Sequence, residues 1–137
     1  MLNITFGWIW ITLGFLTGAA LGMGFHRDTF MGGYGSWCRR LTRLGHIAFF
    51  GTGFLNILAG LTVLALKLDT STIGWTVSLN ALIIGAIAMP LCCFIAARWR
   101  RAKPIFVLPV LSLSLAGIGF SLLLSLHALA RTAGAAP

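Results

Sequence analysis

The chain has 137 residues, of which 58% are hydrophobic and only 9% are charged, whereas a water-soluble domain carries about 25% charged residues. So few charges cannot cover the surface of a soluble domain, and the composition therefore predicts a membrane protein with a single domain over residues 1–137. The net charge of +8 would suit a nucleic-acid-binding protein, but the basic residues are confined to short segments between apolar runs, so we expect no nucleic-acid partner.

Four long apolar segments follow one another along the chain, at residues 4–25, 44–66, 73–97 and 105–130. Each has the roughly 20 residues that a helix needs to cross a hydrocarbon core about 30 Å thick, and none alternates in polarity as the strands of a membrane barrel do. The sequence thus predicts an all-α fold, an integral membrane bundle of four transmembrane helices. The first segment has no preceding positive charge and is longer than the apolar part of a signal peptide, so we expect it to remain as a span.

The first span carries three glycines at a spacing of four residues, Gly14, Gly18 and Gly22. Residues at this spacing share one face of a helix, and small side chains there allow another backbone to approach closely. The pattern predicts close helix packing on this face, either by another helix of this chain or by a second protein.

The two connections on one side of the bundle are strongly basic. The first connection holds one acid, Asp28, and four cations: Arg27, Arg39, Arg40 and Arg43. The second also holds four cations: Arg98, Arg100, Arg101 and Lys103. The opposite side has only Lys67, Asp69 and Arg131. Because basic loops stay in the cytoplasm, this asymmetry predicts that both termini lie on the outer side, with the basic loops on the cytoplasmic side of what we expect to be a bacterial inner membrane.

The segment before the second span is predicted to begin a helix at Ser36, whose side chain can cap it. We expect a short interfacial helix that runs into the second span. Its three arginines, Arg39, Arg40 and Arg43, are candidates for contact with anionic lipid headgroups. The alternative is that these arginines set the orientation of the protein and bind nothing specific.

Histidines are candidate ligands for b-type haem, because a haem between transmembrane helices is often held by two of them. His46 opens the second span and His127 ends the fourth, so about 33 Å of helix separates their depths and they cannot share one haem. His26 and His46 both lie on the basic side and remain as candidate haem-binding residues. The alternative is that His46 is a structural or interfacial residue.

Polar residues inside the spans are expected to find partners, because hydrocarbon offers none. Asn56 on the second span and Asn80 or Ser78 on the third fall at similar depths, so we predict a hydrogen bond that holds these helices together. A polar path for a solute is the alternative function of Asn56 and Asn80. A soft metal ion held by Cys38, His46 and either Cys92 or Cys93 is a further alternative, although small, buried packing residues explain the last two cysteines more simply.

The chain has only two acids, which leaves no pair of carboxylates for general acid–base catalysis inside a span. We therefore expect a non-enzymatic accessory or structural subunit of a larger membrane complex, for example one of electron transfer, whose partners are lipids and other membrane subunits. Two alternatives remain: a haem- or quinone-associated protein that uses His46, and a passive channel or metal-handling protein.

Overall fold

The structure, a computed structural model, describes residues 1–134, and within them all regular structure is helical. The elements in chain order are α1 (Leu2–Phe25), η1 (Phe30–Gly32), α2 (Trp37–Ala65), α3 (Ile73–Arg98), η2 (Arg100–Phe106) and α4 (Val107–Gly134), where η marks a 3₁₀ helix. Four of the helices are long and apolar enough to cross a membrane. The predicted all-α fold with four candidate membrane-spanning helices is confirmed, and it indicates a membrane protein.

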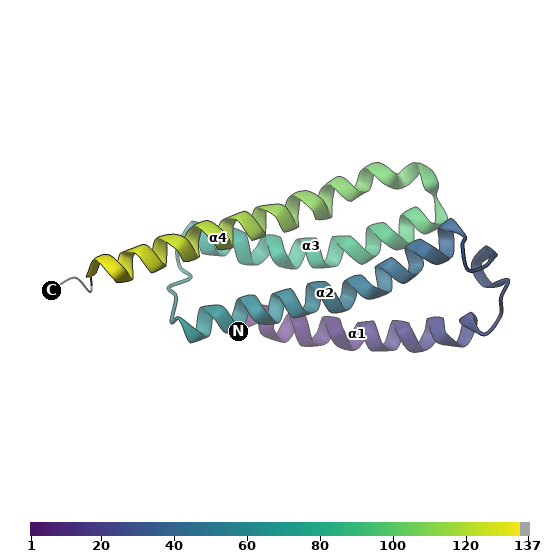
Figure 1. Cartoon of the computed structure of the whole chain (residues 1–137), viewed down its shortest axis with the longest axis horizontal. Helices are drawn as coiled ribbons and strands as arrows, with labels where there is room; N and C mark the ends of the chain where they lie inside the picture. Colours follow the sequence, from purple (N-terminus) through teal and green to yellow (C-terminus); the bar gives the residue numbers. More distant parts are fainter. Residues whose placement is uncertain (135–137) are drawn as a thin grey trace.

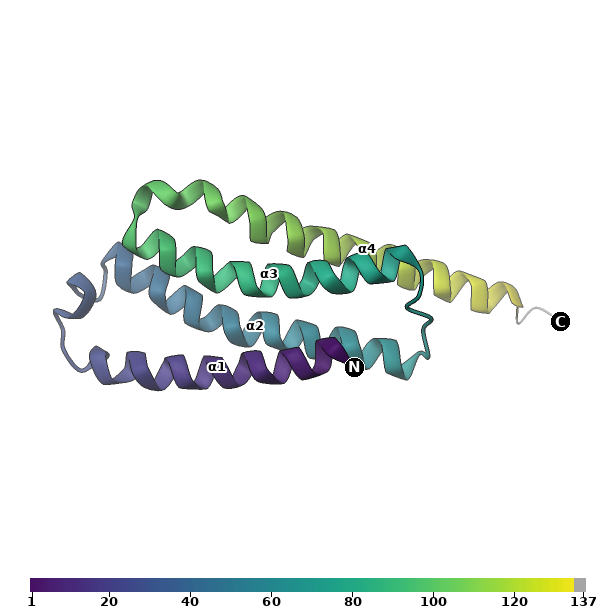
Figure 2. The ribbon, with the colours of Figure 1, turned by 180° about the vertical axis from the view of Figure 1, so that it is seen from behind.

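The four long helices run up and down and lie side by side in the order of the chain (Figure 1). α2 packs on α1 and α3, and α4 packs on α3, whereas α1 and α3 touch only slightly. The view from behind shows the same open row, with α4 extending beyond the start of α3 (Figure 2). Both basic segments, residues 27–43 and 98–103, therefore lie at one end of the molecule, which we call the basic end.

Helix α2 starts seven residues before the predicted second span, because the expected interfacial helix and the span form one continuous helix. Ser36 caps it as predicted, its side-chain oxygen accepting a hydrogen bond from the Arg39 amide at 3.1 Å. At 1.5 Å per residue, the 29 residues of α2 are about 44 Å long. This length exceeds a hydrocarbon core of about 30 Å by about two and a half turns.

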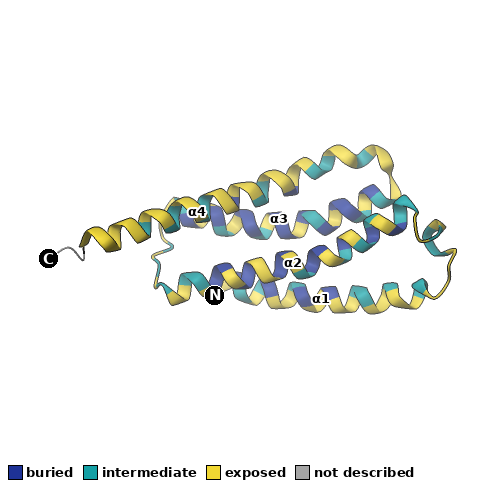
Figure 3. Ribbon diagram, in the orientation of Figure 1, coloured by how far each residue is buried: buried dark blue, intermediate teal, exposed yellow. Residues whose placement is uncertain are grey.

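Figure 3 shows that the buried residues lie mainly on α2 and α3. Many of them are small, whereas many large apolar residues are exposed. Seven alanines are among the buried residues of α2, α3 and α4: Ala48, Ala59, Ala81, Ala86, Ala88, Ala96 and Ala116. In contrast, Leu58, Ile84 and Leu122 are at least half exposed. Helices in lipid gain little by burying leucine against one another, so they instead approach closely over small residues.

The backbones of α1 and α2 approach closely at Gly7 and Gly53. A Cβ atom added to Gly7 would lie 2.6 Å from the carbonyl oxygen of Gly53 and 2.6 Å from the Ile57 side chain. Real Cβ atoms do not come so close to a backbone atom, so any other residue at position 7 would push the helices apart.

The predicted glycine face of α1 is divided by the structure. Gly14 lies against the Phe50 ring and the Phe49 Cβ, and Gly18 lies against His46. A Cβ atom on Gly22 would meet nothing within 4 Å. The contact of α1 with α2 therefore lies nearer the start of α1 than predicted, and it includes Asn3, Gly7 and Ile11.

Candidate functional site

Asn3 joins three helices near the end of the molecule opposite the basic end. Its side-chain Nδ2 donates to Asn56 Oδ1 at 2.9 Å and to the Leu79 carbonyl at 3.1 Å. Asn56 is fully buried and donates its own Nδ2 to the Thr52 carbonyl at 2.9 Å. Because an amide left without a partner in an apolar interior is costly, these bonds fix α1, α2 and α3 relative to one another. We call Asn3, Asn56 and the Leu79 carbonyl the amide node.

The predicted hydrogen bond from Asn56 to Asn80 or Ser78 is not formed. Asn80 is exposed and donates to the Thr76 carbonyl of its own helix, and Ser78 donates to the Gly74 carbonyl. The reason is that Asn3 of α1 enters the seam between α2 and α3 and takes the Asn56 oxygen. Asn56 does tie two helices together, but its partner is on a different helix from the one expected.

Asn80 lines a small polar recess at the same end of the molecule. The recess has a volume of about 240 Å³ and is also lined by Asn3, Thr70 and Thr76. Asn56 does not line it, because Asn3 lies between them. The two asparagines that the sequence suggested as a solute path therefore do not share one polar surface.

His46 lies on α2 with its ring against α1. Its Nδ1 is 3.3 Å from the Thr17 hydroxyl, which itself donates to the Gly14 carbonyl at 2.9 Å. A Cβ atom on Gly18 would lie 2.6 Å from the ring Cε1 and 3.1 Å from Nε2, so this glycine is what allows the ring to lie on the α1 backbone. The ring also meets Phe50 edge-on, with centroids 5.3 Å apart. Packed in this way, His46 joins two helices.

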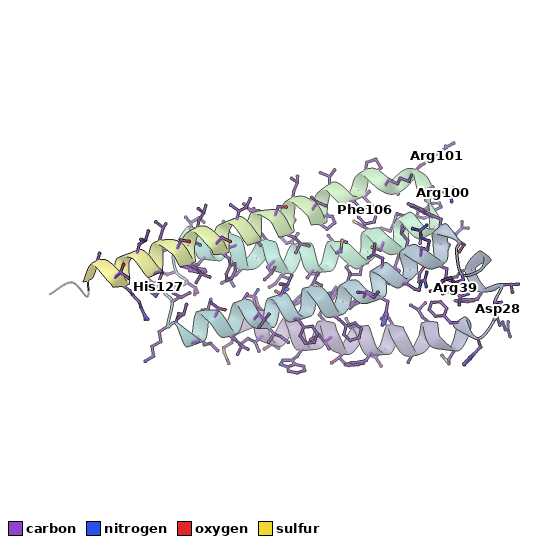
Figure 4. The ribbon with its side chains drawn as sticks, viewed as in Figure 1. Asp28, Arg39, Arg100, Arg101, Phe106 and His127 are labelled. Atoms are coloured by element: carbon purple, nitrogen blue, oxygen red, sulfur yellow. The ribbon has the colours of Figure 1, made fainter. Side chains whose placement is uncertain are left out.

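The structure does not bring His26 to His46. His26 is exposed and forms the C-cap of α1, eight residues beyond the Gly18 position against which His46 packs. Eight residues correspond to about 12 Å along a helix. His127 lies near the opposite end of the molecule from Arg39 (Figure 4), as the depths of the spans predicted. The described residues therefore contain no histidine pair across which a haem iron would be held.

Arg39 has a different role from the predicted contact with lipid headgroups, because it is only 6% exposed. Its guanidinium donates to the Phe25 carbonyl at 3.3 Å and to the Asp28 carbonyl at 3.4 Å, and it lies 4.6 Å from the centre of the Phe25 ring. These carbonyls follow the last turn of α1, where the helix dipole is negative. Arg39 therefore caps α1 from the neighbouring helix.

Arg40 and Arg43 differ from Arg39 in their surroundings. Arg40 is exposed, whereas Arg43 lies 4.3 Å from the centre of the Tyr34 ring and donates weakly to the Tyr34 carbonyl at 3.5 Å. These two arginines border an apolar surface recess on α2 with Leu41, Leu44 and Ile47. Their positions remain compatible with contact to lipid headgroups.

Trp37 links the two basic connections. Its indole Nε1 donates to the Ala96 carbonyl at 2.8 Å, near the end of α3. The Arg100 guanidinium carbon lies 5.4 Å and the Lys103 Nζ 5.0 Å from the centre of its ring. The negative face of the ring attracts both cations, so positive charge from the second connection gathers over an aromatic side chain at the start of α2. Figure 4 shows Arg39, Arg100 and Arg101 at this same end.

Cys92 and Cys93 are buried in α3, and Cys38 is partly exposed near the start of α2. The Cys92 thiol faces the Ile105 carbonyl, whereas Cys93 packs against Gly45. Among residues 1–134, no group of three or more histidine, cysteine or acidic side chains could hold a metal ion. The structure thus leaves the soft-metal alternative without a site in this part of the chain.

An apolar groove with a volume of about 370 Å³ lies at the basic end between α1, α2 and α3. It is lined by Leu21, Met31, Cys38, Phe94, Ala97 and Arg98, with Ala20 on the α1 side and Thr17 and Thr42 as its only hydroxyl groups. Sequence reasoning missed this groove, because its residues come from four separate segments and share no motif.

No family model, curated protein or solved structure matches this chain. Asn56, His46, Ser78 and Asn80 all bond to the protein itself. Among the described residues, the buried Nε2 of His127 has no hydrogen-bond partner.

Proposed function

We propose that the chain is a non-enzymatic, four-span membrane subunit that works by packing against another membrane protein. The observation that carries the proposal is the contrast between satisfied interior groups and an uncovered outer helix. Asn3, Asn56 and His46 all contact protein partners, so they are poor candidates for chemistry. In α4, only 11% of the most apolar stretch is buried within the molecule.

The uncovered surface of α4 carries small residues at positions suited to close helix contact. Gly117, Ser121 and Ser125 follow one another at a spacing of four residues and are exposed. A Cβ atom on Gly117 would meet nothing within 4 Å. The two serine hydroxyls bond to carbonyls within α4, which keeps this surface compatible with an apolar partner. Small residues at this spacing are typical of helix interfaces in membranes.

The orientation that we propose places the basic end in the cytoplasm of a bacterial cell. Two features support it: both basic connections lie at that end, and α2 is about 14 Å longer than a 30 Å core requires. If Ala65 marks the outer border, the excess length puts residues 37–45 of α2 outside the hydrocarbon and His46 at its edge. Arg40 and Arg43 would then reach the level of anionic headgroups.

The test is recovery of the chain from its native membranes in mild detergent, followed by a native gel and mass spectrometry of the co-migrating subunits. We expect the unmodified chain to migrate with at least one further membrane protein, and Gly117→Leu to lose it. Gly51→Leu is the matched control, because Gly51 is also exposed on a helix with nothing within 4 Å of an added Cβ. A chain that migrates alone, or equal loss in both variants, would refute the proposal.

A visible spectrum of the same preparation tests the haem alternative. We expect no Soret band, because the Nε2 side of His46 lies against the α1 backbone at Gly18. A reducible Soret band that disappears in His46→Ala would replace the proposed role with haem binding.

A further inference from the structure

The groove at the basic end has a chemical character that neither the helix contacts nor the proposed function explains. Its lining is almost wholly apolar, from Leu21 and Met31 on one side to Phe94 and Ala97 on the other. Its volume of about 370 Å³ is in the range of small-molecule sites.

The lining of this apolar groove includes one cationic side chain, that of Arg98. Arg98, the last residue of α3, is exposed and contributes to the lining. The surroundings are strongly positive as well, because Arg100 and Lys103 are held nearby over the Trp37 ring. The complementary ligand is therefore an amphiphile with an apolar chain and an anionic head.

We propose that this groove binds one anionic phospholipid, with an acyl chain along Leu21, Met31 and Phe94 and the phosphate at Arg98. The location supports a lipid, since the groove lies where the apolar stretches of α1 and α3 end and the basic connections begin. Basic pockets between helices on the cytoplasmic side of a membrane are suited to anionic lipid heads. This inference is independent of the proposed packing partner.

The test is native mass spectrometry of the full chain, purified into detergent and supplied with equal amounts of phosphatidylglycerol and phosphatidylcholine. We expect one phosphatidylglycerol to be retained in preference to phosphatidylcholine. Arg98→Gln is expected to weaken its retention about fivefold, as loss of one cation near a membrane surface does. Arg101→Gln is the matched control: it removes the same charge from the same connection, but Arg101 does not line the groove. It should retain the lipid.

A second pair of variants tests the apolar part of the groove. Ala20 and Ala19 are adjacent exposed residues of α1, but only Ala20 lines the groove. Ala20→Phe should fill the groove and abolish the bound lipid, whereas Ala19→Phe should keep it. Circular dichroism of both variants establishes that each is folded.

Several outcomes would overturn the inference. Equal retention of phosphatidylcholine would mean that the groove does not recognise an anionic head. Equal loss in Arg98→Gln and Arg101→Gln would mean a diffuse attraction to charge. Retention by Ala20→Phe would place the lipid elsewhere. An adduct with inorganic phosphate alone would mean a simple anion site, and selective retention of an added prenyl quinone that is indifferent to Arg98→Gln would mean a neutral ligand.

Discussion

The inner helices α2 and α3 differ from the outer helices α1 and α4 in how much of their apolar surface the protein covers. The buried share of the most apolar stretch is 39% in α2 and 50% in α3, but only 17% in α1 and 11% in α4. Mean hydropathy does not follow this division, since α4 is more apolar than α2. The hydropathy of a helix therefore indicates that it is suited to a membrane, whereas its small and polar residues determine which face packs against protein.

The largest loss of stability is expected at Gly7, where the backbone of the outer helix α1 lies close to that of the inner helix α2. Gly7→Leu should destabilise the fold by about 3 kcal/mol, at the upper end for overpacked sites, because its side chain would collide with the backbone at Gly53. Unfolding by increasing amounts of dodecyl sulfate, followed by circular dichroism, measures the loss. Gly22→Leu, on the same helix but facing open space, should change little, and comparable losses in both would contradict this view of α1.

The next largest effect concerns the amide node. Asn56→Leu removes the acceptor of Asn3 in a fully buried position and should cost about 1–2 kcal/mol, the range for hydrogen bonds between membrane helices. Asn80→Leu removes an exposed amide that bonds only to its own helix and should cost less.

A double-mutant cycle isolates the bond across α1 and α2. Asn3→Ala, Asn56→Ala and the double variant should show a coupling of about 0.6 kcal/mol or more, because the two side chains bond directly at 2.9 Å. Additive losses would show that Asn3 contributes no specific link to α2.

A smaller effect is expected at the basic end, where Arg39 caps α1. Arg39→Met should destabilise the fold by about 1 kcal/mol, because the carbonyls of Phe25 and Asp28 lose a charged donor. Arg40→Met, an adjacent and exposed change, should leave the dodecyl sulfate midpoint close to that of the unmodified chain. The reverse ranking would contradict the capping role.

The smallest effect on stability is expected in the loop between α2 and α3. The Ser71 backbone amide donates to Asp69 at 2.9 Å, which lowers the pKa of this exposed carboxyl. Because its pKa is lowered, the Asp69 carboxylate contributes to the stability of the fold above the ordinary pKa of aspartate. This stability is lost as the pH falls through the lowered pKa. The chemical shift of the Ser71 amide proton should follow this titration, and in Asp69→Asn it should not.

The sequence was sufficient to predict the number of spans, their limits within a few residues in most cases, and the cap at Ser36. Length and apolarity determine the spans, and these are local properties. The start of α2 was the exception, because hydropathy locates where the apolar run begins and not where the helix begins. The helix continues outward to Trp37 through the arginines.

The partners of the polar residues were harder to predict. Asn3 was overlooked because it precedes the predicted first span, although its spacing of four from Gly7 and eight from Ile11 places it on the same face. Arg39 and Arg40 are adjacent, identical residues, so the sequence does not distinguish them. The fold places Arg39 against the end of α1 and leaves Arg40 exposed. Such choices depend on how neighbouring helices are rotated about their axes, which periodicity alone does not determine.

The serial order of the helices has a consequence for how the chain assembles during synthesis. Each long helix packs mainly on the one made just before it, so most contacts can form without waiting for distant segments, as in other folds rich in near-neighbour contacts. Asn3 is the exception, because one of its two acceptors is the Leu79 carbonyl of α3. In a hairpin of α1 and α2 alone, the Asn3 side chain would lack this second acceptor, so α3 completes its bonding and α4 takes no part in it.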